Sequence, residues 1–418
     1  MSNIRPFKGL RPLPELVKQI SALPYDVMDT EEARDILKDN PLSFLSVTKS
    51  AATLPVGTDE HAPEVYARAK ENLEKYLVSG QMKQDAKPCY YIYRQQMGAY
   101  IQIGLVAAAS VQEYRDNIIK KHELTRTDKE QDRVNHIMAT RAQTGCVFLA
   151  YKSRGEVDAL LIKYMSNHNP VYDFVADDGI KHTLYVVNEP LKIAEITKLF
   201  AQVPCMYIAD GHHRSAAALR VADALSQREG QNGQEEYNSF LAVIFPDNML
   251  HILDYNRMVK DINGLDRSQF MEKVGEKFII KETAQDPKPK KIHTFGMYFE
   301  GRWYMLEAKK ETFLADNAIA ALDVSILQEN LLHPILGITD PRTDDRIAFV
   351  GGIRGLKELE RKVNNGEYMV AFAMYPTSME ELMTVADQGL IMPPKSTWFE
   401  PKLRDAMVVH LIGDAINE

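Results

Sequence analysis

The sequence has few cysteines and lacks a recognisable membrane anchor. Three cysteines occur among 418 residues, at Cys89, Cys146 and Cys205, and none of them forms a CxxC pair. This spacing argues against a disulfide framework and against a thiolate zinc site, and it suits a reducing compartment. The first residues lack the apolar core of a signal peptide, and no uncharged apolar run is long enough to span a bilayer. We therefore expect a cytoplasmic protein without a membrane partner.

An excess of positive charge is also missing. The formal net charge is −8 at pH 7. A protein that binds nucleic acid through its phosphates needs a basic face to attract them, so we expect no nucleic-acid partner. A local basic pocket for a small anionic ligand remains compatible with this balance.

Several catalytic motifs are absent as well. The sequence contains no Gly-x-x-x-x-Gly-Lys-Ser/Thr phosphate loop, no His-Glu-x-x-His zinc helix and no Gly-x-Ser-x-Gly nucleophile turn. Asp210 and His212 match the Asp-x-His opening of the metallophosphoesterase pattern, but the Gly-Asp-x-x-Asp and Gly-Asn-His segments of that family are missing. These absences argue against the usual routes to NTP hydrolysis, proteolysis and ester hydrolysis.

The pattern of apolar residues predicts an α/β protein with a mixed sheet. A chain of this length, 45% hydrophobic, can form two lobes, and a charged stretch with two prolines at residues 281–291 suggests the boundary. We therefore predict an N-terminal lobe at residues 1–280 and a C-terminal lobe at residues 281–418. Helices are predicted at residues 63–79, 126–143, 191–202 and 379–387, and strands at residues 89–95, 100–110, 146–151, 183–188 and 239–245.

The most informative segment covers residues 203–220. An apolar run ends in Asp210, Gly211 permits a sharp turn, and an Ala/Leu-rich segment continues with helical spacing. The first N–H groups of a helix have no internal partner and attract anions, and Gly211 would let a ligand approach them closely. Arg214 can grip phosphate oxygens through two hydrogen bonds, and Asp210 can hold a metal ion or a hydroxyl. The alternative is an ordinary capped turn with solvated histidines, but this cluster at the carboxyl end of a strand favours a site.

Two further polar segments flank predicted elements. Residues 120–125, with the sequence KKHELT, connect a strand to the helix at residues 126–143. Residues 392–399 contain Pro393 and Pro394, which forbid a helix, followed by Lys395, Ser396 and Thr397. The second segment is either a functional loop or a surface loop pinned by its aromatic residues.

These segments together carry a resemblance to known families. The turn at residues 208–214, IADGHHR, resembles the signature of the ParB/sulfiredoxin-like superfamily, in which a Gly-x-x-Arg turn at a helix N-terminus holds nucleotide phosphates. More narrowly, the chain resembles a bacterial family of formerly unknown function that is grouped with the free serine kinases. The other motifs that carry this resemblance lie at residues 5–12, 24–27, 40–44, 122–125, 132–133 and 392–399.

The resemblance implies a fold, a reaction and roles for individual residues. The fold would be a ParB/sulfiredoxin-like nucleotide-binding core with N- and C-terminal elaborations. The reaction would be Mg²⁺-dependent transfer of a phosphoryl group from ATP or ADP to the hydroxyl of free L-serine, giving O-phospho-L-serine. Glu123 would act as catalytic base, and Asp210 would contact Mg²⁺ or the serine hydroxyl. Phosphates would be cradled by Gly211, His212, His213 and Arg214, and the substrate by His122, Thr125, Lys395, Ser396 and Thr397.

Other interpretations stay open at the level of sequence. One is a ParB-like switch that binds a nucleotide without turning over a small substrate, and another is a kinase of a different small hydroxyl compound. The phosphate donor and the oligomeric state are undetermined, a homodimer being one alternative. Arg5, Lys8 and Arg11 are secondary candidates for a cationic pocket, whereas Asp132 and Arg133 are expected to form a structural ion pair.

Overall fold

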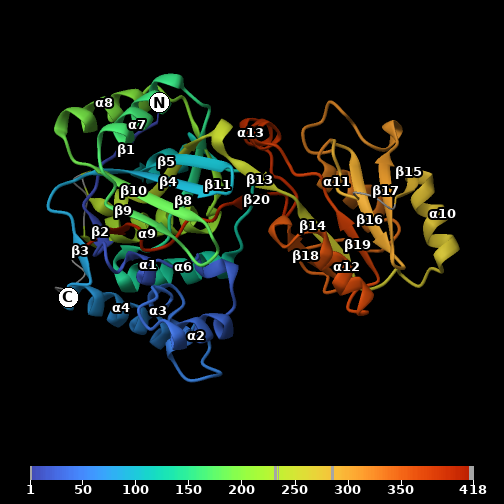
Figure 1. Cartoon of the computed structure of the whole chain (residues 1–418), viewed down its shortest axis with the longest axis horizontal. Helices are drawn as coiled ribbons and strands as arrows, with labels where there is room; N and C mark the ends of the chain where they lie inside the picture. Colours follow the sequence, from blue (N-terminus) through green and yellow to red (C-terminus); the bar gives the residue numbers. More distant parts are fainter. Residues whose placement is uncertain (1, 230–232, 234, 284–286, 414–418) are drawn as a thin grey trace. The chain divides into compact units, whose positions relative to one another are not determined.

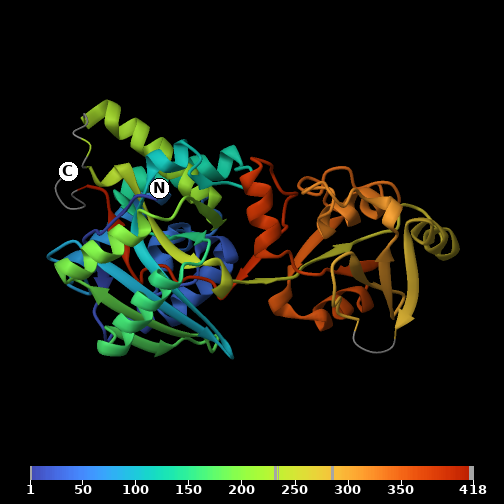
Figure 2. The same ribbon diagram turned by 90° about the horizontal axis from the view of Figure 1, so that it is seen from above.

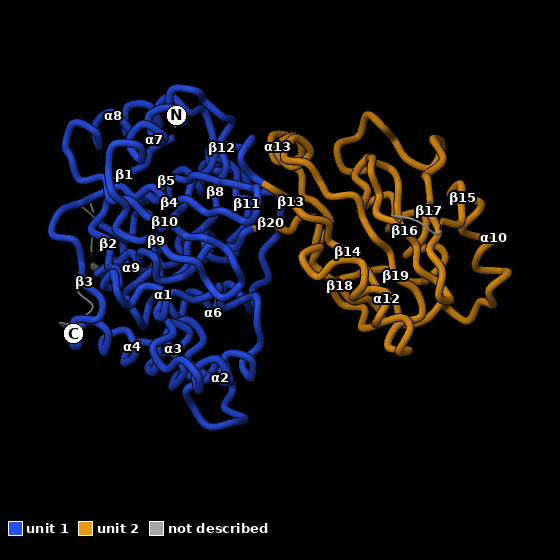
Figure 3. The backbone as a smooth tube through the Cα atoms, viewed as in Figure 1, with its two compact units in different colours: residues 1–250, 401–418 blue, residues 251–400 orange. Residues whose placement is uncertain are grey.

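The chain forms two compact units that are discontinuous in sequence. A computed structural model describes the chain except residues 1, 230–232, 234, 284–286 and 414–418. Unit 1 comprises residues 1–250 and 401–418, and unit 2 comprises residues 251–400 (Figure 3). The boundary differs from the predicted one at residues 280/281, because residues 251–280 supply two strands to the sheet of unit 2 and the chain returns to unit 1 at residue 401. Residues 284–286 of the predicted linker lie outside the described residues.

Unit 1 is built on a nine-stranded mixed sheet, which confirms the predicted mixed α/β class (Figures 1 and 2). The strand order is β6-β11-β8-β12-β5-β4-β10-β9, and β1 pairs with β5. β12 runs parallel to β8 and β11 parallel to β6, while β8 and β11 are antiparallel. The strands are β1 (Ile4–Arg5), β4 (Tyr90–Met97), β5 (Tyr100–Ser110), β6 (Ile119–Lys120), β8 (Val147–Tyr151), β9 (Tyr172–Val175), β10 (Lys181–Val187), β11 (Met206–Asp210) and β12 (Ser239–Pro246).

One face of this sheet packs with helices into a single hydrophobic cluster. Residues of β8 and β12 are buried along their whole length, as their unbroken apolar sequences predict. Alternate residues of these strands, such as Leu149 and Ile244, share the cluster with Leu161, Phe200 and Ala217 of the helices. The helices that contribute are α5 (Val111–Arg115), α6 (Thr127–Thr140), α7 (Gly155–Asn167), α8 (Pro190–Phe200) and α9 (His212–Glu229).

Residues 9–84, together with β7 and the last strand of unit 1, form a second layer with its own core. A four-stranded sheet has the order β3-β2-β21-β7, so the C-terminal strand lies between elements from the start and the middle of the chain. The strands are β2 (Gly9–Pro12), β3 (Met82–Gln84), β7 (Ala142–Gln143) and β21 (Val409–Leu411), and the helices are α1 (Val17–Ile20), α2 (Thr30–Asp39), α3 (Leu45–Thr48) and α4 (Pro63–Val78). A capping box of Asp29 and Glu32 starts α2, and a proline at the first position starts α4.

Unit 2 contains a six-stranded antiparallel sheet of order β15-β17-β16-β19-β14-β18. A two-stranded ribbon of β13 and β20 accompanies it. The strands are β13 (His251–Leu253), β14 (Tyr255–Val259), β15 (Phe278–Thr283), β16 (Thr294–Phe299), β17 (Arg302–Ala308), β18 (Ile347–Gly351), β19 (Val370–Ala373) and β20 (Trp398–Glu400). The helices are α10 (Arg267–Lys277), α11 (Asp323–Leu327), α12 (Leu356–Asn364) and α13 (Met379–Asp387).

One predicted helix end differs from the structure. The helix predicted at residues 126–143 ends at Thr140, because Arg141 adopts a left-handed conformation with φ of 50°. Ala142 and Gln143 then pair with β21, a partner that lies far away in the sequence. No described helix combines the length and the apolar character needed to cross a lipid bilayer.

Candidate functional site

The centre of the candidate site is the junction between β11 and α9. The apolar residues Met206–Ala209 are buried, Asp210 ends the strand, and α9 begins at His212. Gly211 has φ of 97°, and a Cβ atom added to it would lie 3.3 Å from the Cα atom of Val147. The predicted succession of strand, glycine turn and helix is therefore present, and only glycine satisfies both constraints without strain. The first backbone N–H groups of α9 lie at this turn and have no intrahelical acceptors.

Asp210 is held by a lysine from the other end of unit 1. Lys402 Nζ donates to Asp210 Oδ2 at 3.0 Å, and about a third of the Asp210 side chain is exposed. Burial alone would raise the pKa of Asp210, but Lys402 and Arg214 outweigh it and hold this pKa well below the ordinary value. Asp210 is therefore an ionised acceptor at neutral pH.

Arg214 points into the protein rather than out of the turn. It is 9% exposed, and its Nη1 donates to the Cys146 carbonyl oxygen at 2.6 Å. Its Nη2 donates to Asp26 Oδ2 at 3.0 Å. Two of its three nitrogens, Nη1 and Nη2, thus bind protein acceptors. The predicted two-point grip on phosphate would need the same two nitrogens. In this arrangement Arg214 ties α9 to the residue preceding β8 and to the N-terminal segment.

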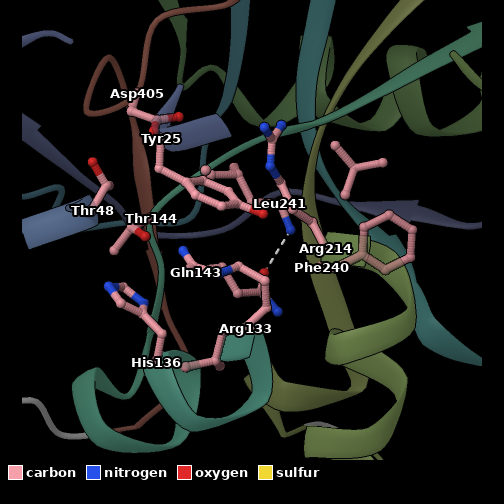
Figure 4. Close-up of a pocket in the computed structure, with 13 residues that line it drawn as sticks. Tyr25, Thr48, Arg133, His136, Gln143, Thr144, Arg214, Phe240, Leu241 and Asp405 are labelled. Carbon is pink, nitrogen blue, oxygen red and sulfur yellow. Dashed lines mark hydrogen bonds between the residues drawn. The ribbon is translucent and has the colours of Figure 1, made fainter. Parts of the chain in front are cut away.

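Around Arg214 lies a buried network of charges and a small cavity (Figure 4). The ring centroid of Tyr25 lies 3.8 Å from the guanidinium carbon of Arg133 and 5.7 Å from the guanidinium carbon of Arg214. Arg133 also pairs with Asp132 at 2.6 Å, both side chains being largely buried, in the manner of a structural ion pair. The cavity measures about 30 Å³, whereas a single water needs about 10–15 Å³, so it fits one or two waters rather than a metabolite.

Asp405 completes this network on the far side of the cavity. Burial raises the pKa of Asp405 to about 7, although the charge of Arg214 acts against the rise. Asp405 Oδ2 and Arg214 Nε are both buried without a hydrogen-bond partner among the described residues. Gly145 lies between them, since a Cβ atom there would be 3.2 Å from Asp405 Oδ1 and 3.5 Å from Arg214 Nε.

A second group of side chains lies where the connection before α6 meets the first residue of α9. The rings of His122 and His212 meet edge to face with their centroids 4.5 Å apart. The His122 backbone N–H donates to His212 Nε2 at 3.5 Å, and Glu123 Oε2 lies 3.8 Å from His212 Nδ1. The structure thus brings His122, Glu123 and His212 together, as a catalytic or binding site would require.

Burial controls the protonation of the two imidazoles. His122 is 2% exposed and His212 5% exposed. Burial lowers the pKa of His122 to about 4, and it lowers the pKa of His212 well below the ordinary value. Both rings are therefore neutral at pH 7. The Glu123 side chain, by contrast, is 43% exposed, so it can reach a ligand from solvent.

Two other predicted site residues in unit 1, Thr125 and His213, form hydrogen bonds with the connection before α6 or with its neighbours. The Arg126 backbone N–H donates to His213 Nε2 at 3.1 Å. Thr125 Oγ1 donates to Glu130 Oε2 at 2.9 Å, and Glu130 in turn pairs with Arg220 of α9 at 3.0 Å. The His213 contact holds the connection against the start of α9, and Glu130 links it to the middle of that helix.

The remaining candidates lie elsewhere. Lys395, Ser396 and Thr397 belong to unit 2, where Ser396 Oγ donates to the Pro393 carbonyl at 2.6 Å. The secondary cationic candidates have acidic partners: Arg5 pairs with Glu236 at 3.1 Å, and Arg11 pairs with Asp85 at 2.6 Å. The substrate role of residues 395–397 remains a prediction.

Four residues of this site had no assigned role in the sequence-based prediction. Tyr25 and Asp26 contact or approach Arg214, Asp405 faces it across the cavity, and Lys402 binds Asp210. Pro24–Tyr25–Asp26 was visible as a motif, but its partner lies 188 residues away along the chain. Pairs of such separation leave no spacing signal in a single sequence.

Comparisons with known proteins give one family match and several distant structural matches. A family profile described as "Protein of unknown function (DUF1015)" matches residues 4–325. A search of curated proteins found no match. A conserved hypothetical protein from Pyrococcus furiosus is 16% identical, with a TM-score of 0.34 over 74% of this chain and 95% of that one.

Two other solved structures are of proteins with more specific names. A free serine kinase in complex with AMP is 14% identical, with a TM-score of 0.34 over 73% of this chain and 92% of that chain. SbnI with a C-terminal truncation, from Staphylococcus aureus, is 12% identical, with a TM-score of 0.39 over 72% and 86%. Likenesses at this level do not establish a shared activity.

The glycine at the junction gives a first prediction. Gly211→Ala should lower the free energy of unfolding by about 1–3 kcal/mol, because it adds both backbone strain and a close contact with Val147. Urea denaturation of the full chain measures this loss. Gly57→Ala is the matched control, since Gly57 has φ of 87° with nothing within 4 Å. Equal losses in the two variants would show that the contact with Val147 contributes nothing.

Asp405 gives a second prediction, on pH dependence. Its pKa rises from 3.8 to about 7 on folding. The stability that it contributes is therefore present in full below pH 4 and is lost as pH rises to about 7, by at most ~1.4 kcal/mol per pH unit. Asp405→Asn should remove this loss, so the stability of the variant relative to wild type should increase between pH 4 and 7. A constant difference across that range, measured by denaturant titration, would contradict the assignment.

Proposed function

The chain belongs to the DUF1015 family, and we propose that it is a cytoplasmic small-molecule kinase. It would transfer a phosphoryl group from ATP or ADP to the hydroxyl of free L-serine and so form O-phospho-L-serine. The observation that carries the proposal is the position of Glu123. Its half-exposed carboxylate lies 3.8 Å from His212 at the first residue of α9, so a candidate base and a candidate anion-binding helix terminus lie side by side.

The nucleotide phosphates would bind at the N-terminus of α9. Gly211 has no side chain that could cover the helix terminus, and the first N–H groups of α9, which lack intrahelical partners, would bind the phosphate oxygens. Arg214 would act from beneath as a positioning residue that fixes the turn, and its buried charge would add to the attraction for phosphate. A ParB/sulfiredoxin-like placement of the core is part of this proposal, because the Gly211–Arg214 turn is the element on which that resemblance rests.

The chemistry asks for a proton acceptor, charge neutralisation and alignment. Glu123 would accept the proton of the serine hydroxyl as its oxygen attacks the terminal phosphorus, while the helix terminus stabilises charge on the phosphate oxygens. The nucleotide leaves with one phosphate fewer. The neutral imidazole of His212 would orient the carboxylate of Glu123.

Mg²⁺ fits this site through the oxygen chemistry of Asp210. Mg²⁺ prefers carboxylate oxygens together with substrate phosphates, and Asp210 is ionised at the edge of the sheet. Oδ2 of Asp210 is paired with Lys402, so the ion would share this carboxylate with the ammonium group or displace it. Contact of Asp210 with the serine hydroxyl is the alternative.

A nucleotide-sensing switch is the second candidate, and one observation favours it. Arg214 connects α9 to Asp26 in the N-terminal segment and acts electrostatically on Asp405 in the C-terminal one. A phosphate that moved α9 would therefore disturb contacts at both ends of unit 1. In that case the protein would bind nucleotide without phosphorylating serine.

The test is formation of phosphoserine by the purified full chain. Wild-type protein with L-serine, Mg²⁺ and either ATP or ADP should give phosphoserine by mass spectrometry. Glu123→Gln should lower the rate at least 100-fold, because the amide cannot accept the proton, while the melting temperature and nucleotide affinity stay nearly unchanged. Parallel reactions with other small hydroxyl compounds in place of serine would show whether one of them is the phosphoryl acceptor instead.

Glu189→Gln is the matched control for this experiment. Glu189 forms another histidine–glutamate pair, with His168 at 3.1 Å, and its side chain is 42% exposed. Its substitution should leave the rate unchanged. Full activity of Glu123→Gln would exclude Glu123 as the base. Nucleotide binding without any phosphorylated product would favour the switch.

A further inference from the structure

The cluster of His122, Glu123 and His212 has the composition of a metal site. Each residue offers one ligand atom, and the three atoms lie within 4.8 Å of one another. Among the described residues, this is the one group of three histidine, cysteine or carboxylate side chains that converges in this way. The ligands come from two segments, the connection before α6 and the first turn of α9, that other contacts already fix together.

The burial of His122 supplies an independent observation. Its side chain is 2% exposed, and neither ring nitrogen makes a well-formed hydrogen bond among the described residues, although the backbone of Ile208 acts on the ring. A buried polar group without a partner loses its hydrogen bonds to water and gains none in return, so such groups are rare unless they meet a ligand. Three other buried imidazoles each have at least one partner: His136 contacts the Val47 carbonyl at 3.0 Å, His182 contacts Tyr93 through Nδ1 at 2.7 Å, and His410 contacts both Gln143 and Glu236. His122 is thus a buried imidazole whose ring nitrogen can serve as a metal ligand close to those of Glu123 and His212.

We propose that His122, Glu123 and His212 bind a borderline divalent transition-metal ion, with Zn²⁺ as the best match. Two imidazoles and one carboxylate are ligands that Zn²⁺ accepts in catalytic sites, and they leave a fourth position open for water or an anionic oxygen. Mg²⁺ is a hard ion that prefers oxygen, so this set selects against it. The site is therefore distinct from the Mg²⁺ contact proposed for Asp210, but it shares Glu123 with the proposed kinase, so a bound Zn²⁺ would occupy the carboxylate that is proposed as the base.

Metal binding requires the ligand atoms to move closer together. Zn–N bonds of about 2.0–2.1 Å place tetrahedral ligand atoms about 3.3 Å apart, whereas here they lie within 4.8 Å of one another. The half-exposed Glu123 side chain can rotate, and the two imidazoles must also shift. His212 Nδ1 faces Glu123. A neutral imidazole that binds metal through Nδ1 carries its proton on Nε2, so the 3.5 Å contact with the His122 amide must lengthen on binding.

The experiment uses the full chain after removal of metals with a chelator. Equilibrium dialysis against Zn²⁺, followed by elemental analysis, should give one equivalent per chain, and Mg²⁺ in large excess should not displace it. Co²⁺ as a probe should give visible absorption bands from nitrogen and oxygen ligands. His122→Asn, His212→Asn and Glu123→Gln should each weaken Zn²⁺ binding at least tenfold. His168→Asn should leave binding unchanged, because His168 and Glu189 form a pair without a third ligand.

Two results would overturn the metal site. One is wild-type protein that binds no more Zn²⁺ than His122→Asn, and the other is equal weakening by His168→Asn. Melting temperatures of the metal-free variants show whether a buried substitution has unfolded the site, and the partly exposed Glu123→Gln then decides. Serine phosphorylation without Zn²⁺ binding contradicts this inference alone, whereas Zn²⁺ binding without phosphorylation contradicts only the proposed kinase.

Discussion

The contact of the Arg214 guanidinium with the Cys146 carbonyl and the Asp26 carboxylate is the interaction on which the site depends. It fixes the first turn of α9 to the residue before β8 and to the N-terminal segment. A buried guanidinium is costly unless its donors are satisfied, and here two nitrogens find protein acceptors. Burial alone would lower the pKa of Arg214, but Asp26 and Asp210 raise it above the ordinary value. The cation is therefore permanent.

This arrangement divides the site into an inner and an outer part. The inner part contains Tyr25, Arg133, Arg214 and Asp405 around a cavity of about 30 Å³, which is too small for serine or a nucleotide. The outer part contains the exposed Glu123 carboxylate and the partly exposed Asp210. Chemistry with a ligand from solvent therefore belongs to the outer groups, while the inner charges keep the backbone of the turn in place. A structural role for Arg214 is compatible with a phosphate site, because backbone amides can bind phosphate by themselves.

Local features of the fold were predictable from sequence, and long-range pairings were not. The β11–α9 junction is encoded by an apolar run, one glycine and an Ala-rich helix, all within 18 consecutive residues of the sequence. The hairpin of β4 and β5 is equally local. Lys402 and Asp210, however, are 192 residues apart, and β21 inserts beside β2 from the end of the chain. The return of residue 401 to unit 1 likewise has no marker in composition, so the boundary was placed differently.

The most direct test is a crystal structure of the full chain with a non-hydrolysable ATP analogue and Mg²⁺. We expect the terminal phosphates within hydrogen-bond distance of the His212 or His213 amide nitrogen, with Arg214 still bound to the Cys146 carbonyl and to Asp26. Phosphates bound away from the start of α9 would contradict this account. So would an Arg214 that leaves both protein acceptors to bind phosphate.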